Sequence, residues 1–434
     1  MDNINILNLV IIFVVSILLG VSYVRFLTVH PIRIGLYAFL STLFLLAVII
    51  LTTTQFQGWG LIAALVMDLV GFTGGYVWMT KRLLAREDPR PIPELTRRKE
   101  DSGLGHTAII YFTHGEPETY DPIGWINQFN EFDEQKIPFV PLVARPFFIY
   151  SLRRSYLSVG RSEHRRTHLR MVKALEQEFR SMGDNTTRFY VSFLDDNPRP
   201  DAAFIQALND GASRIIVAEV FVSDSNHTLE GKHLIQAVNA DDLGVPVIYT
   251  GPMYDSEIMY SMFVERVHAN IGSLDKSKVG ILLVGHGQPD EWDREFATET
   301  EHELLFRNKI LDQFEQAGFP RRNLSLAWME FKEPKPAPKI EEFGLNGVEK
   351  IFYFSAAISA DALHSQWDVP HLISKARNPK NIPTINLGAW NDDPFVIRAI
   401  KEKILNVMDG IQGNGESIVI QVDRQKITTE MEEN

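Results

Sequence analysis

Residues 111–117 read Tyr-Phe-Thr-His-Gly-Glu-Pro, and residues 283–289 read Leu-Val-Gly-His-Gly-Gln-Pro. Each stretch begins within an apolar run and ends in the pattern His-Gly-x-Pro. A short apolar run closed by glycine and proline is typical of a buried strand that ends in a tight turn. The sequence therefore predicts two buried strands, each of which delivers a histidine, His114 or His286, to the turn that follows it.

A second histidine follows a second strand candidate in each half of the chain. His227 lies 16 residues after Gly211, and His364 lies 17 residues after Gly347. Motifs that recur in the same order at nearly the same spacing indicate an internal duplication. Because open α/β sheets bind ligands outside the carboxyl ends of their strands, the four histidines predict a metal site between two lobes.

Apolar strand candidates alternate with amphipathic helical stretches from residue 106 onward. The candidates are residues 108–112, 188–193, 214–221, 245–249, 279–284, 324–328, 350–355 and 384–387. Strands that alternate with helices, such as 168–182 and 301–317, predict parallel sheets covered on both faces. We therefore expect an α/β fold with two similar doubly wound parallel-sheet lobes, residues 106–275 and 276–410, preceded by three transmembrane helices.

The composition excludes several kinds of chemistry. The 434 residues contain no cysteine, which excludes disulfides, thiolate metal sites and cysteine nucleophiles. Metal chemistry is then left to His, Asp and Glu. The net charge of -12 argues against nucleic acid as a main partner, because phosphate contacts need a basic face. No glycine-rich phosphate-binding motif supports nucleotide binding.

Three apolar stretches fill residues 1–80, which we interpret as a membrane anchor. Residues 4–24, 34–51 and 59–79 are each about long enough to cross a hydrocarbon core of ~30 Å as a helix. The third stretch contains Asp68, which is either functional or held against the neighbouring helices.

The basic residues predict the orientation of the anchor. The loop before the second stretch carries Arg25 and Arg33, residues 52–58 carry no charge, and the segment after the third stretch is rich in lysine and arginine. By the positive-inside rule, the short N-terminus lies outside and the remainder lies in the cytoplasm. Residues 81–105 form a basic juxtamembrane linker that we expect to lie against anionic headgroups, and residues 411–434 form a polar tail.

Three groups of residues resemble the class II tetrapyrrole chelatases, the superfamily of ferrochelatase and the sirohydrochlorin chelatases. The two His-Gly-x-Pro turns resemble the opening turns of the two halves of those enzymes. Residues 153–164 resemble a ferrochelatase segment with a tyrosine before a glycine and a serine. Residues 325–331, 347–354 and 364–370 together resemble the sirohydrochlorin chelatase ending, in which a histidine lies shortly before Asp-Ile-Pro. The resemblance covers about 300 residues.

One departure from the ferrochelatase pattern affects the expected site. Ferrochelatases usually place a glutamate opposite the second-half histidine, in a Ser-Asp-His-x-x-Glu context. Residues 355–364 read Ser-Ala-Ala-Ile-Ser-Ala-Asp-Ala-Leu-His, without that glutamate. Asp361 or His364 is expected to take its place, and His364 would give the two-histidine arrangement of the sirohydrochlorin enzymes.

The resemblance implies that the working site lies in the second half. Neutral imidazole binds Fe²⁺, Co²⁺ or Ni²⁺ and is also a base with a pKa near ~6.5. We therefore predict that His286 and His364 bind the metal and act in catalysis, with Glu330, Asp361 or Asp368 relaying protons. His114 and His227 are further candidate metal ligands, or they only hold their turns.

Several other residues have two interpretations each. His164 and His168 lie beside three arginines, so they begin a solvated basic helix or grip substrate propionates. Residues 141–150 form a porphyrin-facing lip or an ordinary core segment, and Trp292 and Trp367 are equally open.

The sequence thus predicts a membrane-anchored chelatase that inserts a divalent metal, Fe²⁺ first and Co²⁺ or Ni²⁺ as alternatives, into a tetrapyrrole such as a porphyrin. The metal is a substrate, and no prosthetic group is expected. The alternative is a non-catalytic tetrapyrrole or metal carrier with the same fold, whose helices dock a membrane protein partner. A periplasmic-binding-type sensor is contradicted by the basic flank after the third apolar stretch. Expected partners are the tetrapyrrole, the metal ion and the lipid bilayer.

Overall fold

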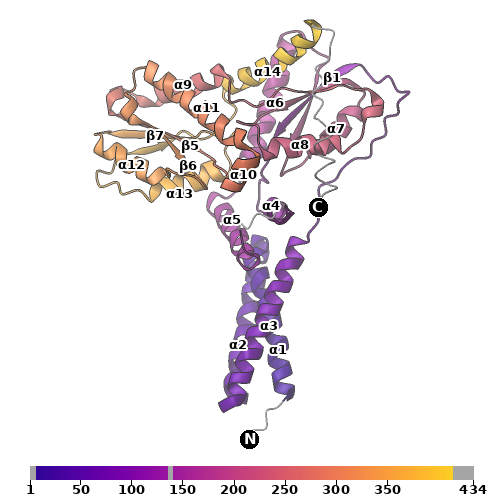
Figure 1. Ribbon diagram of the computed structural model, residues 1–434, viewed down its shortest axis with the longest axis vertical. Coiled ribbons are helices and arrows are strands. Elements are labelled where there is room, and N and C mark those ends of the chain that lie inside the picture. The colour runs from indigo at the N-terminus through magenta and orange to yellow at the C-terminus, as the bar shows by residue number, and fades with distance from the viewer. Residues whose placement is uncertain (1–5, 135–139, 414–434) are drawn as a thin grey trace. The chain divides into compact units, whose positions relative to one another are not determined.

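The computed structural model describes residues 6–134 and 140–413. The chain divides into two compact units (Figure 1). One comprises Met1–Pro89 with Pro117–Ser162, and the other comprises Arg90–Glu116 with Glu163–Asn434. The chain therefore passes between the units three times. We call them the anchor unit and the sheet unit.

Three long helices form the body of the anchor unit. They are α1 (Ile6–Thr28), α2 (Ile34–Gln55) and α3 (Gly58–Leu84). All three are long and apolar enough to cross a membrane, so the three expected spans are present as helices.

Glycines let α1 and α3 pack closely. A Cβ atom at Gly75 would lie 2.2 Å from the carbonyl oxygen of Ile17, and one at Gly20 would lie 2.3 Å from that of Phe72. Small residues at such contacts are typical of helix pairs in membranes, where backbones must approach closely to gain packing energy.

Asp68 is held by hydroxyl groups from the other two helices. Its carboxylate accepts hydrogen bonds from Ser16 Oγ at 2.7 Å and from Thr52 Oγ1 at 2.9 Å. A carboxylate within an apolar membrane helix needs such partners. Of the two interpretations of Asp68, the structure therefore supports the packed one.

The anchor unit also contains elements that the sequence assigned to the first lobe. These are α4 (Ile123–Glu134), the 3-10 turn η2 (Leu142–Ala144) and α5 (Arg145–Val159). They contact α1 and α3, so the segment 117–162 packs with the membrane helices although it lies within the range 106–275. Residues 141–150 are therefore part of the anchor unit, which neither of their two interpretations anticipated.

The sheet unit holds eight strands, and each expected strand forms. They are β1 (His106–Thr113), β2 (Arg188–Phe193), β3 (Ala212–Glu219), β4 (Val247–Tyr249), β5 (Val279–Gly285), β6 (Leu324–Trp328), β7 (Lys350–Ser355) and β8 (Thr384–Asn386). They form two parallel four-stranded sheets of the orders β2-β1-β3-β4 and β6-β5-β7-β8. The two orders correspond strand by strand, which confirms the predicted fold class of two similar parallel-sheet lobes.

Helices cover both faces of each sheet. They are α6 (His164–Ser181), α7 (Pro200–Asn209), α8 (Asn226–Gln236), α9 (Glu257–Ile271), α10 (Asp290–Glu295), α11 (Ala297–Gln316), α12 (Pro336–Leu345), α13 (Val369–Ser374) and α14 (Pro394–Gly413). Alternate residues of the central strands enter different cores, as the two-residue period of a strand requires. Ile109 and Ile281 enter one shared core with α6, α9, α11 and α14, which lies between the two sheets (Figure 1).

Residues 90–105, the greater part of the predicted linker, are held by the first lobe. Arg90 donates to the carbonyl oxygen of Asp196 at 3.0 Å, and Asn209 Oδ1 accepts the amide of Thr96 at 2.8 Å. The expectation that this basic segment lies against headgroups is therefore wrong for Arg90, because the protein itself binds this side chain. The predicted tail, residues 411–434, lies mostly outside the described residues.

Candidate metal-insertion site

The first histidine of each lobe stands in the turn after the central strand of its sheet. His114 follows β1, and its Nδ1–H donates to the carbonyl oxygen of Gly115 at 2.9 Å. His286 follows β5, and its Nδ1–H donates to that of Gly287 at 2.7 Å. A carbonyl oxygen only accepts, so both neutral rings carry their proton on Nδ1. The lone pair of Nε2 is therefore available to a metal ion.

The second histidine of each lobe lies against the first. The ring centroids of His114 and His227 are 4.7 Å apart, with an interplanar angle of 80°. Those of His286 and His364 are 5.3 Å apart at 75°. Both separations are far below the distance of about 10 Å at which shared coordination of one ion is excluded. The duplicated motifs thus produce two edge-to-face imidazole pairs.

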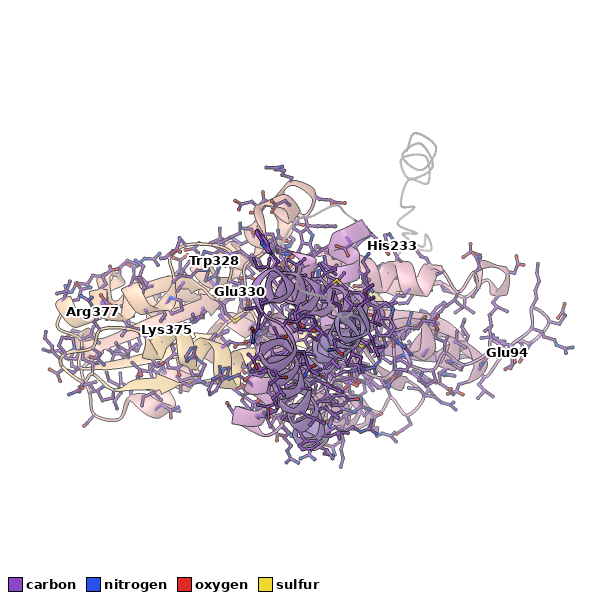
Figure 2. The ribbon with its side chains drawn as sticks, turned by 90° about the horizontal axis from the view of Figure 1, so that it is seen from below. Glu94, His233, Trp328, Glu330, Lys375 and Arg377 are labelled. Carbon is purple, nitrogen blue, oxygen red and sulfur yellow. The ribbon has the colours of Figure 1, made fainter. Side chains whose placement is uncertain are left out.

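The backbone around the two pairs is bonded in the same way. His114 O accepts the amide of Asp195 at 2.8 Å, and His286 O accepts the amide of Glu330 at 3.0 Å. Each first histidine therefore has an acidic residue beside it, at the carboxyl end of the neighbouring strand. Trp328 and Glu330 mark that end of β6 in Figure 2.

Asp368 distinguishes the second pair from the first. Its Oδ2 lies 2.7 Å from Nδ1 of His364, within the π-helical turn η6 (His364–Asp368). Burial opposes a charge on His364, but the hydrogen bond to Asp368 and the negative charges of Asp368, Glu330 and Glu116 raise the pKa of His364 to about 9. This histidine is a strong base that holds a proton at neutral pH.

His286 has the opposite character. Burial, reinforced by the neighbouring His364, lowers the pKa of His286 to about 3. Its imidazole is therefore neutral throughout the physiological range and suited to bind a metal ion without first losing a proton. The pKa of Glu330 is raised, mainly by burial. The second lobe thus joins a neutral ligand to a base and a buried carboxyl.

In the first lobe, the position that corresponds to Asp368 is a glycine. Asp368 lies four residues after His364, and Gly231 lies four residues after His227. No hydrogen-bond partner is present for the buried Nδ1 of His227 in the described part of the chain. Burial, with the nearby His114 and His286, lowers the pKa of His227 well below its usual value. The first pair therefore consists of imidazoles without a supporting acid at this position.

A buried ion pair on α11 holds the turn that carries His286. Glu303 Oε2 accepts the amide of His286 at 3.1 Å and lies 3.5 Å from Nη2 of Arg307. Arg307 also donates to the carbonyl oxygen of Ala327 at 2.7 Å and lies 3.9 Å from the centre of the Trp328 ring. The pair thus connects the His286 turn to the end of β6. The sequence analysis missed both residues, because nothing in the local pattern of α11 shows which loop its buried side chains reach.

His164 and His168 are buried, with 3% and 0% of their surfaces exposed. The expectation that they begin a solvated helix is therefore wrong, and binding of propionates stays a prediction. His168 Nδ1 lies 2.7 Å from the hydroxyl of Tyr111, and its Nε2 lies 3.2 Å from Ser359 Oγ in the second lobe. Burial lowers the pKa of His164 well below its usual value. The neighbouring His168, and then His114 and His364, lower it further. These histidines therefore join the two lobes behind the two pairs.

Other predicted residues lie apart from the pairs or beside them. The carboxylate of Asp361 accepts hydrogen bonds from Ser365 Oγ at 2.9 Å and Asn391 Nδ2 at 3.0 Å, which connects the His364 turn to the loop after β8. Trp292 is buried, with its ring 6.4 Å from that of His227. Trp367 stacks on His371 at 5.7 Å.

Glu116 is a further residue that the sequence analysis did not single out as a site residue. It follows the His114 turn in the first lobe, and its Oε1 accepts the amide of Leu363, the residue before His364, at 3.0 Å. The carboxylate thus supports the His364 turn from the other lobe. Its place directly before the segment 117–162 gave no signal of this contact.

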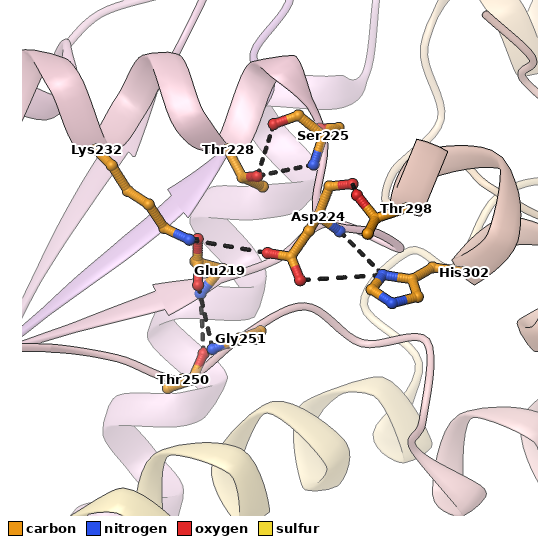
Figure 3. Close-up of polar contacts among 9 residues, drawn as sticks. All are labelled: Glu219, Asp224, Ser225, Thr228, Lys232, Thr250, Gly251, Thr298 and His302. Atoms are coloured by element: carbon orange, nitrogen blue, oxygen red, sulfur yellow. Dashed lines mark hydrogen bonds and ion pairs between the residues drawn. The ribbon is translucent and has the colours of Figure 1, made fainter. Parts of the chain in front are cut away.

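A second contact between the lobes is made by Asp224, three residues before His227 in the chain (Figure 3). The amide of Asp224 donates to His302 Nδ1 at 3.3 Å, and Thr298 Oγ1 donates to the carbonyl oxygen of Asp224 at 3.2 Å. Thr298 and His302 belong to α11, the helix that also carries Glu303. One helix therefore touches the histidine loops of both lobes.

The ligand set is small within residues 6–134 and 140–413. No group of three or more His, Asp or Glu side chains there is arranged to hold a metal ion. Each pair alone offers two imidazoles, so further ligands have to come from a bound molecule or from water. Two protein ligands suit a metal ion that is bound transiently better than a metal ion that is held permanently.

No family model matches the chain, and neither does any curated protein. Solved structures do resemble it. SirB from Bacillus subtilis with Fe³⁺ aligns over 71% of this chain and 98% of its own, with a TM-score of 0.47 and 13% identity. The sirohydrochlorin chelatase SirB from Bacillus subtilis subspecies spizizenii, in complex with cobalt, aligns over 71% and 98%, with a TM-score of 0.44 and 11% identity.

A multi-domain protein from Deinococcus radiodurans, described as structurally similar to chelatases and as having two additional novel domains, aligns over 70% of this chain and 54% of its own. Its TM-score is 0.41, and its identity is 13%.

Proposed function

We propose that this protein is a membrane-anchored chelatase that inserts a divalent metal ion into a tetrapyrrole. The observation that carries the proposal is the pair of His286 and His364, 5.3 Å apart at the carboxyl edge of a parallel sheet, with His364 bonded to Asp368. One member is a neutral ligand, and the other is a strong base. Metal insertion needs both, since the ion must be held while protons leave the macrocycle.

The proposed roles follow from these differences. His286 binds the incoming ion through Nε2 while the ion loses water. Two pyrrole N–H protons leave the ring as the metal enters, so charge balances without an oxidant or reductant. His364, oriented by Asp368, accepts the first proton in those molecules in which its ring is neutral, and we assign acceptance or relay of the second proton to the buried Glu330. Asp361 is not included, because its oxygens are bonded to other side chains.

We propose a porphyrin as the substrate and Fe²⁺ as the metal, with Co²⁺ and Ni²⁺ as alternatives. Three apolar helices support an apolar substrate that partitions into lipid. A heavily carboxylated ring such as sirohydrochlorin needs no membrane. The first pair, His114 and His227, is proposed to bind the metal ion before it passes to the second pair, His286 and His364.

The decisive experiment is anaerobic metal insertion by the full-length protein in detergent, with porphyrins and sirohydrochlorin as parallel substrates. Absorbance of the metallated ring reports turnover. We expect His286→Ala to lower kcat by about 10²-fold or more, because a ligand to the reacting ion is lost. His114→Ala should mainly raise the KM for the metal.

The binding of the ring, measured by fluorescence quenching, is the control. His286→Ala should leave it unchanged, since the ring is held mainly by apolar contacts. Undiminished turnover in a folded His286→Ala protein would refute the site. Tight binding of ring and metal by the parent protein without any turnover would instead identify a non-catalytic carrier.

We further propose that the sheet unit lies in the cytoplasm. The basic residues Lys81 and Arg82 in the last turn of α3, and the uncharged loop between α2 and α3, support this orientation. An alkaline phosphatase reporter fused after Asn434 should be inactive, and a fluorescent reporter that folds only in the cytoplasm should be bright. The opposite result for both fusions would reverse the topology.

A further inference from the structure

The segment from Pro117 to Ser162 gives the anchor unit an element beside its three spans. The turn η2 contacts α3 and the helix α5 contacts α1, in both cases toward the C-terminal end of the span. Figure 1 shows α5 beside those helices. The question is whether this element touches lipid as well as protein.

Contacts along α5 give its level relative to the spans. Val143 O accepts the hydroxyl of Tyr76 at 2.7 Å, and the ring of Phe147 lies 6.4 Å from that of Tyr23. Tyr76 is eight residues before Leu84, the last residue of α3, and Tyr23 is five residues before Thr28, the last residue of α1, which places them roughly 12 Å and 7–8 Å inside their helix ends. The beginning of α5 therefore lies beside the bodies of α1 and α3 and not at their last residues.

The other end of α5 lies at the level of the helix ends. Arg153 donates to the carbonyl oxygens of Phe26 at 2.5 Å and Val29 at 3.2 Å, where α1 finishes. The hydroxyl of Tyr156 donates to Pro117 O at 2.6 Å, which is outside the spans. Helix α5 thus begins beside the apolar bodies of α1 and α3 and ends beside the C-terminal end of α1.

The exposed side chains change character along the same direction. At the beginning they are apolar: Val143 is 54% exposed, Phe147 47% and Phe148 39%. Further along, the exposed residues are Ser151, Arg154, Leu157 and Ser158, of which three are polar and Leu157, 56% exposed, is apolar. Exposed phenylalanines at the deep end, followed by a mainly polar set with an arginine at the shallow end, match the polarity gradient of a bilayer interface.

We propose that η2 and the first turns of α5 insert into the interfacial layer of the bilayer as a fourth membrane-contacting element. Lipid is the partner, because this surface continues the surface of the three spans at the level that contacts with Tyr76 and Tyr23 define. Phe147, Phe148 and Val143 lie among the upper acyl carbons, and Arg154 reaches the headgroups. This inference is independent of the proposed metal insertion.

Spin labels on single cysteines provide the test, because the chain has no cysteine of its own. The variants Val143→Cys, Phe147→Cys, Ser151→Cys and Ser158→Cys of the full-length protein would be labelled in vesicles of phosphatidylcholine with a minority of phosphatidylglycerol. Relaxation by oxygen, which concentrates in the bilayer, is compared with relaxation by a water-soluble nickel chelate. The oxygen-to-nickel ratio should be about threefold to tenfold higher at 143 and 147 than at 158, with 151 between them, because polar complexes are excluded from apolar surroundings.

Two reference sites calibrate the scale. Leu43→Cys on the exposed face of α2 gives the value inside the bilayer, and Leu345→Cys, at an 87% exposed position of the sheet unit, gives the value in water. Ratios at 143 and 147 equal to the water reference would overturn the proposal. Low accessibility to both reagents at 143 and 147 would also overturn it, because a protein surface, such as a second copy of the chain, would then cover the patch.

Discussion

Asp368 is the residue that gives the second histidine pair its division of roles. It sits 2.7 Å from Nδ1 of His364 and counteracts the effect of burial on that ring. His286 has no acidic side chain bonded to its ring, and burial, reinforced by the neighbouring His364, lowers its pKa to about 3. Two imidazoles in contact therefore differ widely in basicity. A single carboxylate is sufficient to separate a base from a ligand.

The pH dependence of turnover should report this carboxylate. His364 accepts a proton only when it is neutral. The kcat should therefore rise with pH and level off above the pKa of His364, which is about 9. Asp368→Asn keeps an acceptor for Nδ1–H but removes the charge that stabilises the imidazolium. The pKa of His364 should then fall, and the pH at which kcat levels off should move down by about 1–3 units.

Kinetic profiles of the parent and of Asp368→Asn, measured between neutral and alkaline pH, check this expectation. Asp361→Asn is the control, since its carboxylate is bonded to Ser365 and Asn391, whereas the ring of His364 is bonded to Asp368. If kcat levels off at the same pH in the parent protein and in Asp368→Asn, His364 is not the base.

At the scale of elements, close packing of α1 on α3 depends on glycines of one face of α3. Gly75 has the carbonyl group of Ile17 against it, whereas an added Cβ at Gly74 meets nothing within 4 Å. Gly75→Ala should therefore force the helices apart and cost about 2 kcal/mol or more. Gly74→Ala should be neutral or stabilising by up to ~1 kcal/mol, because alanine favours helix.

Thermal unfolding of the two variants in detergent would show the difference. The neighbouring position makes Gly74→Ala a matched control for composition and helix propensity. A loss of the same size in both variants would mean that the interface of α1 with α3 is not the source of the effect.

The elements that the sequence predicted well are those with a local signal. All eight strands formed because each is an apolar run between turn residues, and the paired histidines were visible because their turns repeat. Asp368 was a candidate from its spacing alone. Glu116, Glu303 and the buried pair of His164 and His168 act across elements or lobes, so their contacts depend on tertiary packing that no local pattern contains.

The partner of the segment 117–162 was likewise hidden. Its helices carry apolar residues, as any packed helix does, but the pattern does not say whether a sheet or a set of membrane helices covers them. The order of elements along the chain suggested the sheet, and the contacts with α1 and α3 show the membrane helices.

At the scale of the whole molecule, the anchor is not a removable tail. The chain enters the anchor unit a second time at Pro117, directly after the first histidine turn. Deleting residues 1–89 would leave the apolar side chains of 117–162 without their partners. We expect such a truncated protein to aggregate, although the sheet unit has its own cores.

A second deletion separates the causes. Removing residues 1–89 and also replacing 117–162 with a short glycine-serine linker should give a soluble protein, which size-exclusion chromatography can follow. Near-ultraviolet circular dichroism would confirm packed aromatic residues. A soluble, monodisperse protein after deletion of 1–89 alone would show that 117–162 does not need the spans.

The glycine that follows His227 has a consequence for how the two halves diverged. A Cβ atom at Gly231 would lie 2.2 Å from the ring of Phe112. In the second lobe, the residue that corresponds to Phe112 is the smaller Val284. If one ancestral unit gave rise to both halves, the first cannot regain an acid beside its histidine through one substitution, since Phe112 must shrink first. A substitution at Gly231 alone would clash with the ring of Phe112, and a smaller residue at position 112 alone would leave a cavity. Each single substitution is therefore destabilising, so the difference between the two lobes is difficult to reverse.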